Sequence, residues 1–338
     1  MNKILERPTL KNEYIVPCSK SVLHRLLILQ AFAKKEVEIT YDEPVGDDIK
    51  ATIECLKTLK AYRYETDFHQ NSETFNIPTL DCRDSGSTYR FLLGVTNKLG
   101  IKCKLTGTNK LIERVNSGAP TSQFLTGEIL GTYLAGKDIN SVTIPDNQVS
   151  KSYIDLTKDI IKKFDSNSSI HAEGDWSLGA LWLVAGAISG RKVAVKNLDD
   201  SSMQGDKRIV DLIKLFAETD ERVIDGSLNP DLVPILSVLA SFSKGTTRIE
   251  NIEHLRHKES DRVESPARLI NNLGGNAFTG RDYIEIEGKR LTGGTVDAEN
   301  DHRIAMAAGI AAFGIDGKVE IIGAEAVGKS YPKFWEEF

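Results

Sequence analysis

Segments in which apolar residues recur at helical spacing are distributed along the whole chain, and each directly follows a short polar cluster. The clusters are rich in Ser, Thr, Gly, Asp, Lys and Arg. Several of these residue types favour a helix start because they cap unpaired backbone N–H groups. We therefore expect helices over Val22–Ala33, Tyr89–Thr96, Phe124–Ala135, Tyr153–Phe164, Leu178–Ile188, Leu232–Phe242, Arg262–Leu273 and Ile304–Phe313.

Shorter segments between these helices alternate in polarity and are rich in β-branched residues, which predicts strands. They are Val37–Tyr41, Lys102–Leu105, Val193–Val195, Thr246–Ile249 and Val319–Ile322. Helices and strands thus alternate through two similar halves, a pattern typical of α/β repeats. The length of 338 residues is too great for one compact core and suits two domains.

Some of the polar clusters also carry a cation. Capping alone explains each cluster taken singly, but capping requires no cation. A helix N-terminus next to a cation is suited to bind phosphate or carboxylate, because its N–H groups and dipole favour negative charge. Ser21 and Arg25 are four residues apart on one helix face, and so are Gly86 and Arg90. The clusters taken together therefore indicate anion binding at Lys20, Arg25, Arg90, Arg262 and Arg303.

The charge balance limits which anions the protein handles. Lys and Arg total 43 against 48 Asp and Glu, a net charge of −5. This excludes the broad basic surface that nucleic acid or an anionic membrane requires. No apolar run has the ~20 residues that span a bilayer, and Met1–Pro8 does not resemble a signal peptide. Cys18, Cys55, Cys82 and Cys103 lack metal-site spacing. We expect a cytoplasmic protein with reduced thiols and no metal.

Short motifs follow one another in a fixed order from the first helix to the C-terminus. They are Pro17-Cys18-Ser19-Lys20-Ser21-Val22-Leu23-His24-Arg25, Asp84–Arg90, Glu113-Arg114, Thr121-Ser122-Gln123-Phe124, Ser150–Asp155, Glu173–Asp175, Ser202–Asp206, Asn229-Pro230-Asp231, Asn251–Arg262, Asp301-His302-Arg303 and Val327-Gly328-Lys329. In this order they resemble the motifs of the 5-enolpyruvylshikimate-3-phosphate synthase family. The resemblance extends over nearly the whole chain.

The resemblance implies an α/β fold of two domains, each an inverse α/β barrel of repeated βαβαββ-type units, with the active site in the interdomain cleft. It places the N-terminal domain at 19–171, with most of the shikimate-3-phosphate site. The C-terminal domain would comprise 1–18 and 172–338, with the catalytic base and most phosphoenolpyruvate contacts. Because ligands would contact both domains, we expect the cleft to close on binding.

The activity that the resemblance implies is transfer of the enolpyruvyl group of phosphoenolpyruvate to the 5-hydroxyl of shikimate-3-phosphate, with release of phosphate. It implies a monomer with no cofactor. The positions that match the family's shikimate-3-phosphate site are Lys20, Ser21, Arg25, Thr121, Ser122, Gln123, Ser150, Tyr153, Asp231, His254 and Lys258. Those that match its phosphoenolpyruvate site are Lys20, Gly86, Arg114, Gln123, Arg262, Arg303 and Lys329.

Addition followed by elimination requires a base near the 5-hydroxyl and a proton donor near C3 of the enolpyruvyl group. By resemblance Asp231 is the base, Glu259 and Lys258 handle the C3 proton, and Lys20 completes the catalytic set. Without the resemblance, Asp231 beside Pro230 is explained as a helix cap, and Lys258-Glu259 as a solvated charged turn.

Three segments are shorter than the resemblance leads us to expect. A hairpin-bearing segment is missing after Arg114, another after Phe164 and a third after Phe216. Each loss removes strands that should cover a buried helix, so we expect uncovered apolar surface there. Three interpretations are open: a trimmed but active enzyme, a relative that binds its ligands poorly, or a chain whose internal residues are missing from this sequence.

Two other functions remain as alternatives. One is enolpyruvyl transfer to UDP-N-acetylglucosamine, in which the family's relative uses a cysteine in a Gly-rich loop, and no cysteine here lies in such a loop. The other is a non-catalytic or impaired relative of the same fold. A protein that only binds would not need the acid and base, so Asp231 and Glu259 argue against it.

Overall fold

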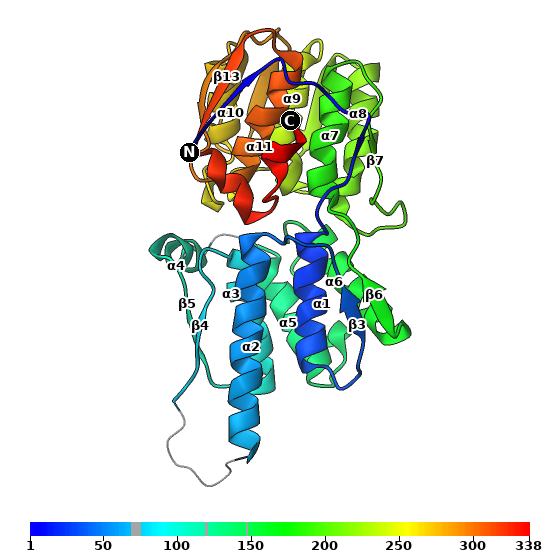
Figure 1. Ribbon diagram of the computed structural model, residues 1–338, viewed down its shortest axis with the longest axis vertical. Coiled ribbons are helices and arrows are strands. Elements are labelled where there is room, and N and C mark those ends of the chain that lie inside the picture. The colour runs from blue at the N-terminus through cyan, green and yellow to red at the C-terminus, as the bar shows by residue number, and fades with distance from the viewer. Residues whose placement is uncertain (69–75, 119–120, 147) are drawn as a thin grey trace. The chain divides into compact units, whose positions relative to one another are not determined.

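The computed structural model describes residues 1–68, 76–118, 121–146 and 148–338, which divide into two compact units (Figure 1). Unit 1 comprises Met1–Pro17 and Gly174–Phe338, and unit 2 comprises Cys18–Glu173. The domain boundaries that the sequence predicts, at residues 18 and 172, fall beside these. Within the described residues, no helix combines the length and apolar character needed to cross a membrane.

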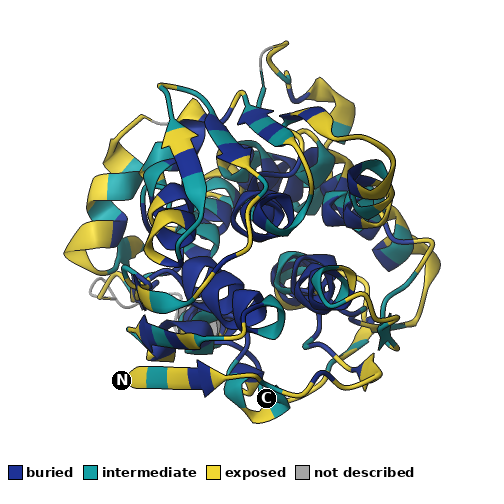
Figure 2. Ribbon diagram, turned by 90° about the horizontal axis from the view of Figure 1, so that it is seen from above, coloured by how far each residue is buried: buried dark blue, intermediate teal, exposed yellow. Residues whose placement is uncertain are grey.

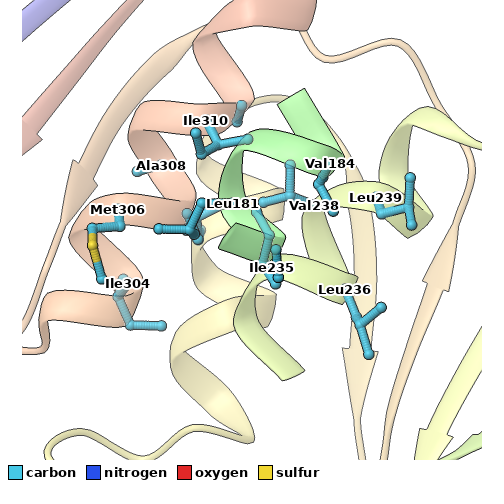
Figure 3. Close-up of a cluster of buried hydrophobic side chains, with 14 of the residues drawn as sticks. Leu181, Val184, Ile235, Leu236, Val238, Leu239, Ile304, Met306, Ala308 and Ile310 are labelled. Carbon is cyan, nitrogen blue, oxygen red and sulfur yellow. The ribbon is translucent and has the colours of Figure 1, made fainter. Parts of the chain in front are cut away.

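Unit 1 is built around three helices, α7 (Trp176–Ile188), α9 (Val233–Phe242) and α11 (His302–Ala311), which pack against one another. Figure 3 shows Leu181 of α7, Ile235 of α9 and neighbouring side chains of α11 meeting in this core. Residues on every face of α11 are buried, because other elements surround this helix on all sides. The inner helices are accordingly dark blue in Figure 2, whereas most exposed residues lie on outer elements.

Strands and outer helices of unit 1 cover this core. One sheet has the order β10-β11-β9-β8, in which α9 connects the parallel strands β8 and β9, and α10 leads on to the hairpin β10–β11. This succession has the order βαβαββ. The elements are β8 (Glu221–Asp225), β9 (Thr246–Glu250), α10 (Glu264–Asn272), β10 (Asn276–Thr279) and β11 (Ile284–Glu287).

A second sheet of unit 1 joins the two ends of the chain. Its order is β1-β13-β12, with β12 and β13 parallel across α11 and β1 antiparallel to β13. A third sheet pairs β2 with β7 in parallel, and α8 follows β7. These elements are β1 (Asn2–Glu6), β2 (Glu13–Tyr14), β7 (Ala194–Val195), α8 (Ile209–Glu218), β12 (Gly294–Asp297) and β13 (Lys318–Ile322).

Unit 2 consists mainly of helices that run side by side (Figure 1). The closest pair is α3 and α5, where a Cβ on Gly94 would come within 2.3 Å of the Gly127 backbone. The helices are α1 (Lys20–Phe32), α2 (Asp47–Phe68), α3 (Gly86–Leu99), α4 (Asn109–Asn116), α5 (Gln123–Leu134) and α6 (Ser152–Ser166). Two parallel strand pairs accompany them, β3 (Glu38–Thr40) with β6 (Ser169–His171) and β4 (Thr79–Asp81) with β5 (Lys104–Thr106).

All the predicted helices and strands are present, with small shifts at their ends. For example, α10 begins at Glu264 rather than Arg262, and the Asp261 carboxylate accepts the N–H groups of Val263 and Glu264 in the turn that leads into it. The sequence analysis missed the helices α2, α4 and α8. It also missed strands of two to five residues, such as β8 and the two-residue β2, whose partner β7 lies far away in the chain.

The three short segments coincide with helices that the chain passes through without interruption. Arg114 lies in α4, Phe164 in α6 and Phe216 in α8. Each of these helices is next along the chain to a strand of a sheet that has two strands within the described residues: β5 before α4, β6 after α6 and β7 before α8. A βαβαββ unit without its hairpin leaves a two-stranded sheet, as these three places have.

A basic side chain lies at the C-terminal end of each of these helices. Arg222 donates to the carbonyl oxygens of Thr219 and Phe216 after α8, and its guanidinium carbon lies 4.5 Å from the Phe216 ring centroid. Lys35 donates to the Phe164 carbonyl of α6 over 3.1 Å, and Arg90 to the Arg114 carbonyl of α4 over 3.3 Å. Cations stabilise helix C-termini because unpaired carbonyl groups and the helix dipole meet there.

Candidate active site

Side chains cap the N-termini of four helices as the polar clusters predict. Ser19 accepts an N–H of α1 and Ser85 an N–H of α3 in unit 2, while Asp175 caps α7 and Asp301 caps α11 in unit 1. In α5 and α6 the capping residues, Ser122 and Lys151, make no such side-chain bond. Capping thus accounts for some of the polar clusters but not for all of them.

In unit 1 a buried guanidinium connects three carboxylates. Arg262, whose side chain is 2% exposed, donates to Asp301 Oδ2 over 2.7 Å, to Asp231 Oδ1 over 2.9 Å and to Glu259 Oε2 over 2.7 Å. Burial alone would lower the pKa of Arg262, but Asp301, Glu259 and Asp231 outweigh it and raise that pKa. Arg262 therefore stays charged, and its guanidinium binds both Asp231, the predicted base, and Glu259, a predicted carrier of the C3 proton.

Two further cations approach these carboxylates. Arg303 Nη2 lies 2.8 Å from Asp231 Oδ2, and Arg303 Nη1 donates to the Asp231 backbone carbonyl over 3.3 Å. Lys329 Nζ lies 3.7 Å from Glu259 Oε1. The last turn of η6 (Ala324–Lys329) supplies Lys329, and the first turn of α11 supplies Arg303. Five of the sequence-predicted residues of unit 1 thus form one cluster of three cations and two carboxylates.

A second buried carboxylate lies close to Asp231. Asp206 is the last residue of the Ser202–Asp206 motif, is 4% exposed and accepts from the Ser177 hydroxyl and from the amide of Asn229. Burial, and next the charge of Asp231, raise the pKa of Asp206 to about 6. The sequence analysis quoted this motif but assigned Asp206 no role.

His254 and Lys258 belong to the same Asn251–Arg262 motif as Arg262. His254, in η4 (Glu253–His257), is 8% exposed, and burial, and next the charge of Lys258, lower its pKa to about 4. A neutral imidazole at ordinary pH can donate or accept a hydrogen bond but carries no charge. His254 therefore suits a hydroxyl better than a phosphate.

In unit 2, Arg25 of α1 is a buried hub that bonds to α6 and, through the Thr126 hydroxyl, to α5. It is 1% exposed and donates to Thr157 Oγ1 over 2.8 Å, to the Tyr153 carbonyl over 3.0 Å and to the Ser21 carbonyl over 2.5 Å. Burial lowers the pKa of Arg25 to about 9. The structure thus brings Arg25 together with the backbone carbonyl groups of Ser21 and Tyr153, and the guanidinium bonds to protein groups.

A second group in unit 2 surrounds the start of α3. The Gln123 amide accepts from Arg90 Nη1 over 2.7 Å and donates to Ser87 Oγ over 2.9 Å. A Cβ on Gly86 would lie 2.6 Å from Arg90 Nη1, so a larger residue there would push the Arg90 guanidinium away from its present position. Arg114 donates to the carboxylate and the carbonyl of Asp84, over 2.6 and 3.0 Å. Gly86, Arg114 and Gln123 therefore lie around one helix N-terminus.

The other predicted residues of unit 2 lie at further helix starts. Lys20 is the first residue of α1, and its Nζ lies 2.7 Å from Asp48 Oδ2 at the start of α2. Thr121 accepts the Gln123 N–H just before α5, with Ser122 between them. Ser150, before α6, has a φ of 57°, a left-handed conformation that costs a non-glycine residue energy and is often found at functional sites.

The sequence analysis missed Asp48 and Asp206. It named Arg90 but missed the hydrogen bonds by which Arg90 connects α3 with Gln123 and with the end of α4. Asp48 was detectable, because Gly46-Asp47-Asp48 precedes the apolar positions Ile49 and Ile53 in the same pattern as the other polar clusters. The contacts of Arg90 with Gln123 and with the end of α4 were not detectable, since they join segments 24 and 33 residues apart.

Comparison with known proteins gives a consistent result. The model of the EPSP synthase (3-phosphoshikimate 1-carboxyvinyltransferase) family matches residues 6–114 and 162–338. A 3-phosphoshikimate 1-carboxyvinyltransferase of Clostridium acetobutylicum is 35% identical over 409 aligned residues, which cover 97% of this chain and 94% of the relative. The protein of that name from Clostridium kluyveri is 34% identical over 415 residues, covering 100% and 97%.

Solved structures with the same fold include an EPSP synthase from Acinetobacter baumannii, with a TM-score of 0.68 at 19% identity, covering 100% of this chain and 97% of that one. The enolpyruvyl transferase NikO from Streptomyces tendae has a TM-score of 0.59 at 12% identity, covering 99% and 96%. These structures support a mixed α/β fold over the whole chain.

The alignments also bear on the three short segments. The alignment of 409 residues with the Clostridium acetobutylicum relative is longer than the 338-residue chain itself, so that relative contains internal segments with no counterpart here. The family model leaves out residues 115–161, a stretch that begins at the first of the predicted gaps. This unmatched stretch contains five of the residues assigned to the substrate sites, namely Thr121, Ser122, Gln123, Ser150 and Tyr153.

Proposed function

The chain belongs to the EPSP synthase family, and from this we propose that it transfers the enolpyruvyl group of phosphoenolpyruvate to the 5-hydroxyl of shikimate-3-phosphate and releases phosphate. The observation that supports the proposal best is the cluster of unit 1, in which Asp231 and Glu259 each form an ion pair with Arg262. The reaction requires two proton-transfer groups beside cations that bind an anionic substrate, and the cluster supplies both.

Asp231 is the proposed base for the 5-hydroxyl. Its two oxygens are oriented by Arg262 and Arg303, which restricts the direction from which a substrate hydroxyl reaches a remaining lone pair. As the hydroxyl oxygen adds to C2 of phosphoenolpyruvate, its proton passes to Asp231. The methylene C3 receives a proton at the same stage, which Glu259 or the adjacent Lys258 donates.

Elimination reverses the C3 step. The C–O bond to phosphate breaks, C3 loses a proton to the group that donated one, and the enol double bond forms again. Arg303 and Lys329 already neutralise the two proton-transfer carboxylates. A substrate phosphate or carboxylate that binds these cations would loosen them from Asp231 and Glu259, and it would make both carboxylates better proton acceptors.

Residues of unit 2 complete the proposed sites. The backbone N–H groups at the start of α3, with Arg114 and Gln123 beside them, suit the anionic groups of phosphoenolpyruvate. Lys20 is proposed to contact both substrates and to act in catalysis. Shikimate-3-phosphate is assigned to the remaining polar residues at the starts of α1, α5 and α6, namely Ser21, Arg25, Thr121, Ser122, Ser150 and Tyr153, together with His254 and Lys258 of unit 1.

The finer predictions of fold and assembly belong to the same proposal. They are an inverse α/β barrel in each unit, a domain division by substrate, an active site to which both units contribute, a monomer, and a cytoplasmic location. Support for the barrel comes from the three inner helices of unit 1 and its complete βαβαββ succession.

The test is phosphate release by the purified protein. Release from phosphoenolpyruvate is expected only when shikimate-3-phosphate is also present, and not with UDP-N-acetylglucosamine as the acceptor. Asp231→Asn and Glu259→Gln should each lower kcat by about 10²–10⁴, the usual contribution of a general acid or base. Glu253→Gln is the matched control, because Glu253 pairs with the exposed Arg281 only six residues before Glu259. Wild-type protein without acceptor-dependent release would refute the proposal.

A further inference from the structure

A buried chain of hydrogen bonds connects three helices of unit 2. His24 Nδ1 of α1 lies 2.8 Å from Thr52 Oγ1 of α2, which lies 2.7 Å from Thr88 Oγ1 of α3. Thr88 in turn donates to Ser85 Oγ over 2.7 Å. None of the residues matched to the family's substrate sites belongs to this chain of polar groups, which we call the hydroxyl chain (His24, Thr52, Thr88, Ser85).

The hydroxyl chain is closed to solvent. His24 and Ser85 are 1% exposed, and Thr52 and Thr88 are 0% exposed. A buried polar group without a partner is costly, so each of these groups depends on the next for its hydrogen bond. Removing one hydroxyl therefore leaves its neighbours without a hydrogen-bond partner, and water cannot reach them to take its place.

The direction of the chain follows from His24. Burial, and next the charges of Lys20 and Arg25, lower the pKa of His24 well below its ordinary value, so the ring is neutral. Its Nε2 is buried and has no hydrogen-bond partner among the described residues. An orphaned N–H is rarer in proteins than an orphaned acceptor, which places the proton on Nδ1. Nδ1 then donates to Thr52, Thr52 to Thr88, and Thr88 to Ser85.

The first turn of α3 is part of the hydroxyl chain, through Ser85 before the helix and Thr88 within it. Ser85 Oγ also accepts the Thr88 N–H, the bond that caps α3, and the helix begins at the next residue, Gly86. Thr88 Oγ1 lies 3.2 Å from the backbone carbonyl of Asp48, whose carboxylate holds Lys20. The same hydroxyls thus connect the turn at Gly86 with the residue that orients Lys20.

We propose that His24, Thr52 and Thr88 are positioning residues, which hold the first turn of α3 and the Asp48–Lys20 pair in the relative geometry that binds phosphoenolpyruvate. This inference rests on the proposed function, which assigns Gly86 and Lys20 to that substrate. The positioning residues touch no substrate; they act through the Ser85 cap and through Asp48.

The decisive variant is Thr52→Val, which removes the central hydroxyl and keeps the shape of the side chain. Losing one buried hydrogen bond corresponds to about a tenfold effect on binding, so the KM for phosphoenolpyruvate should rise about tenfold. The KM for shikimate-3-phosphate should rise clearly less than that for phosphoenolpyruvate, because among its proposed contacts Lys20 is linked to Thr52 through Asp48, whereas the Arg25 hub does not involve Thr52. Thr52→Ser restores the hydroxyl and should restore the KM.

The control is Thr96→Val, which makes the same change at a buried threonine of α3. The Thr96 hydroxyl donates to the carbonyl of Leu92 in its own helix, outside the hydroxyl chain. Its KM values should equal those of the wild type. Thr88→Val provides an independent second variant, with the same expected rise, in case Thr52→Val does not fold.

The possible outcomes separate the two proposals. A wild type that releases no phosphate refutes the proposed function and the premise of this inference with it. An active wild type, with folded Thr52→Val or Thr88→Val variants whose KM for phosphoenolpyruvate stays unchanged, overturns the positioning role alone. An equal rise in both KM values, or a loss that Thr52→Ser does not restore, would assign the threonines to general stability and also overturn it.

Discussion

Replacing Arg222 by Met should destabilise unit 1, because this arginine covers the end of α8, where the sequence analysis expects a hairpin to be missing. The side chain is 4% exposed and lies over the Phe216 ring. It donates to Thr247 Oγ1 over 2.9 Å and to the carbonyl groups of Thr219 and Lys244. Met has a similar length and covers the ring, but it donates no hydrogen bond.

The size of the effect follows from the acceptors left behind. Each buried acceptor without a partner costs about 1–3 kcal/mol. The Thr247 hydroxyl is 0% exposed and loses its donor outright, whereas Thr219 and Lys244 are exposed residues whose carbonyl groups water can reach. One buried acceptor at ~1–3 kcal/mol and a smaller loss at each exposed carbonyl, less the cost of burying the guanidinium that the variant avoids, leave about 1–3 kcal/mol. Arg222→Lys, which keeps the charge but reaches fewer acceptors, should lie in between.

Tryptophan fluorescence during urea unfolding measures this effect in the right unit. The three tryptophans of the chain, Trp176, Trp182 and Trp335, all lie in unit 1. Arg281→Met is the matched control, because the Arg281 side chain is 83% exposed and pairs with Glu253 on the surface of the same unit. If Arg222→Met shifts the urea midpoint no more than Arg281→Met does, the idea that Arg222 compensates for the missing hairpin is wrong.

Three further outcomes are expected. Burial raises the pKa of Asp206 to about 6 from 3.8, so the fold favours its protonated form, and stability falls as the pH rises from about 4 to about 6. Asp206→Asn should therefore gain about 2–3 kcal/mol relative to the wild type across that window, and parallel curves of unfolding free energy against pH would contradict this. Gly94→Ala should destabilise unit 2 by at least about 1–3 kcal/mol, measured by circular dichroism, since its Cβ would meet the Gly127 backbone at 2.3 Å. Ser85→Ala removes the cap of α3 and should cost about 1 kcal/mol by the same method, and an unchanged midpoint would exclude a capping role.

Much of the local structure of this protein was readable without coordinates. A polar cap followed by apolar residues at helical spacing located α1, α3 and α7, because capping and burial of one face are local requirements. The order of short motifs was enough to identify the family and to predict the shortened segments. Asp48 escaped notice only because the same pattern was not applied to α2.

Contacts between distant segments were not readable. Arg222 covers the end of α8 through Thr247, which is 25 residues away, and Arg25 reaches Thr157, which is 132 residues away. The very short strands were missed for the same reason, since β2 pairs with β7 about half the chain away and two residues carry no pattern of their own.

The sequence by itself therefore determined where the helices begin, which residue types lie at those starts, and which family they resemble. Only the tertiary structure decided how those residues are partnered: that Arg262 joins Asp231, Glu259 and Asp301, and that threonine hydroxyls connect α1, α2 and α3. The physical reason is range. Capping and periodicity act within a few residues, whereas a buried charge or hydroxyl must find its partner wherever the fold brings one within hydrogen-bond distance.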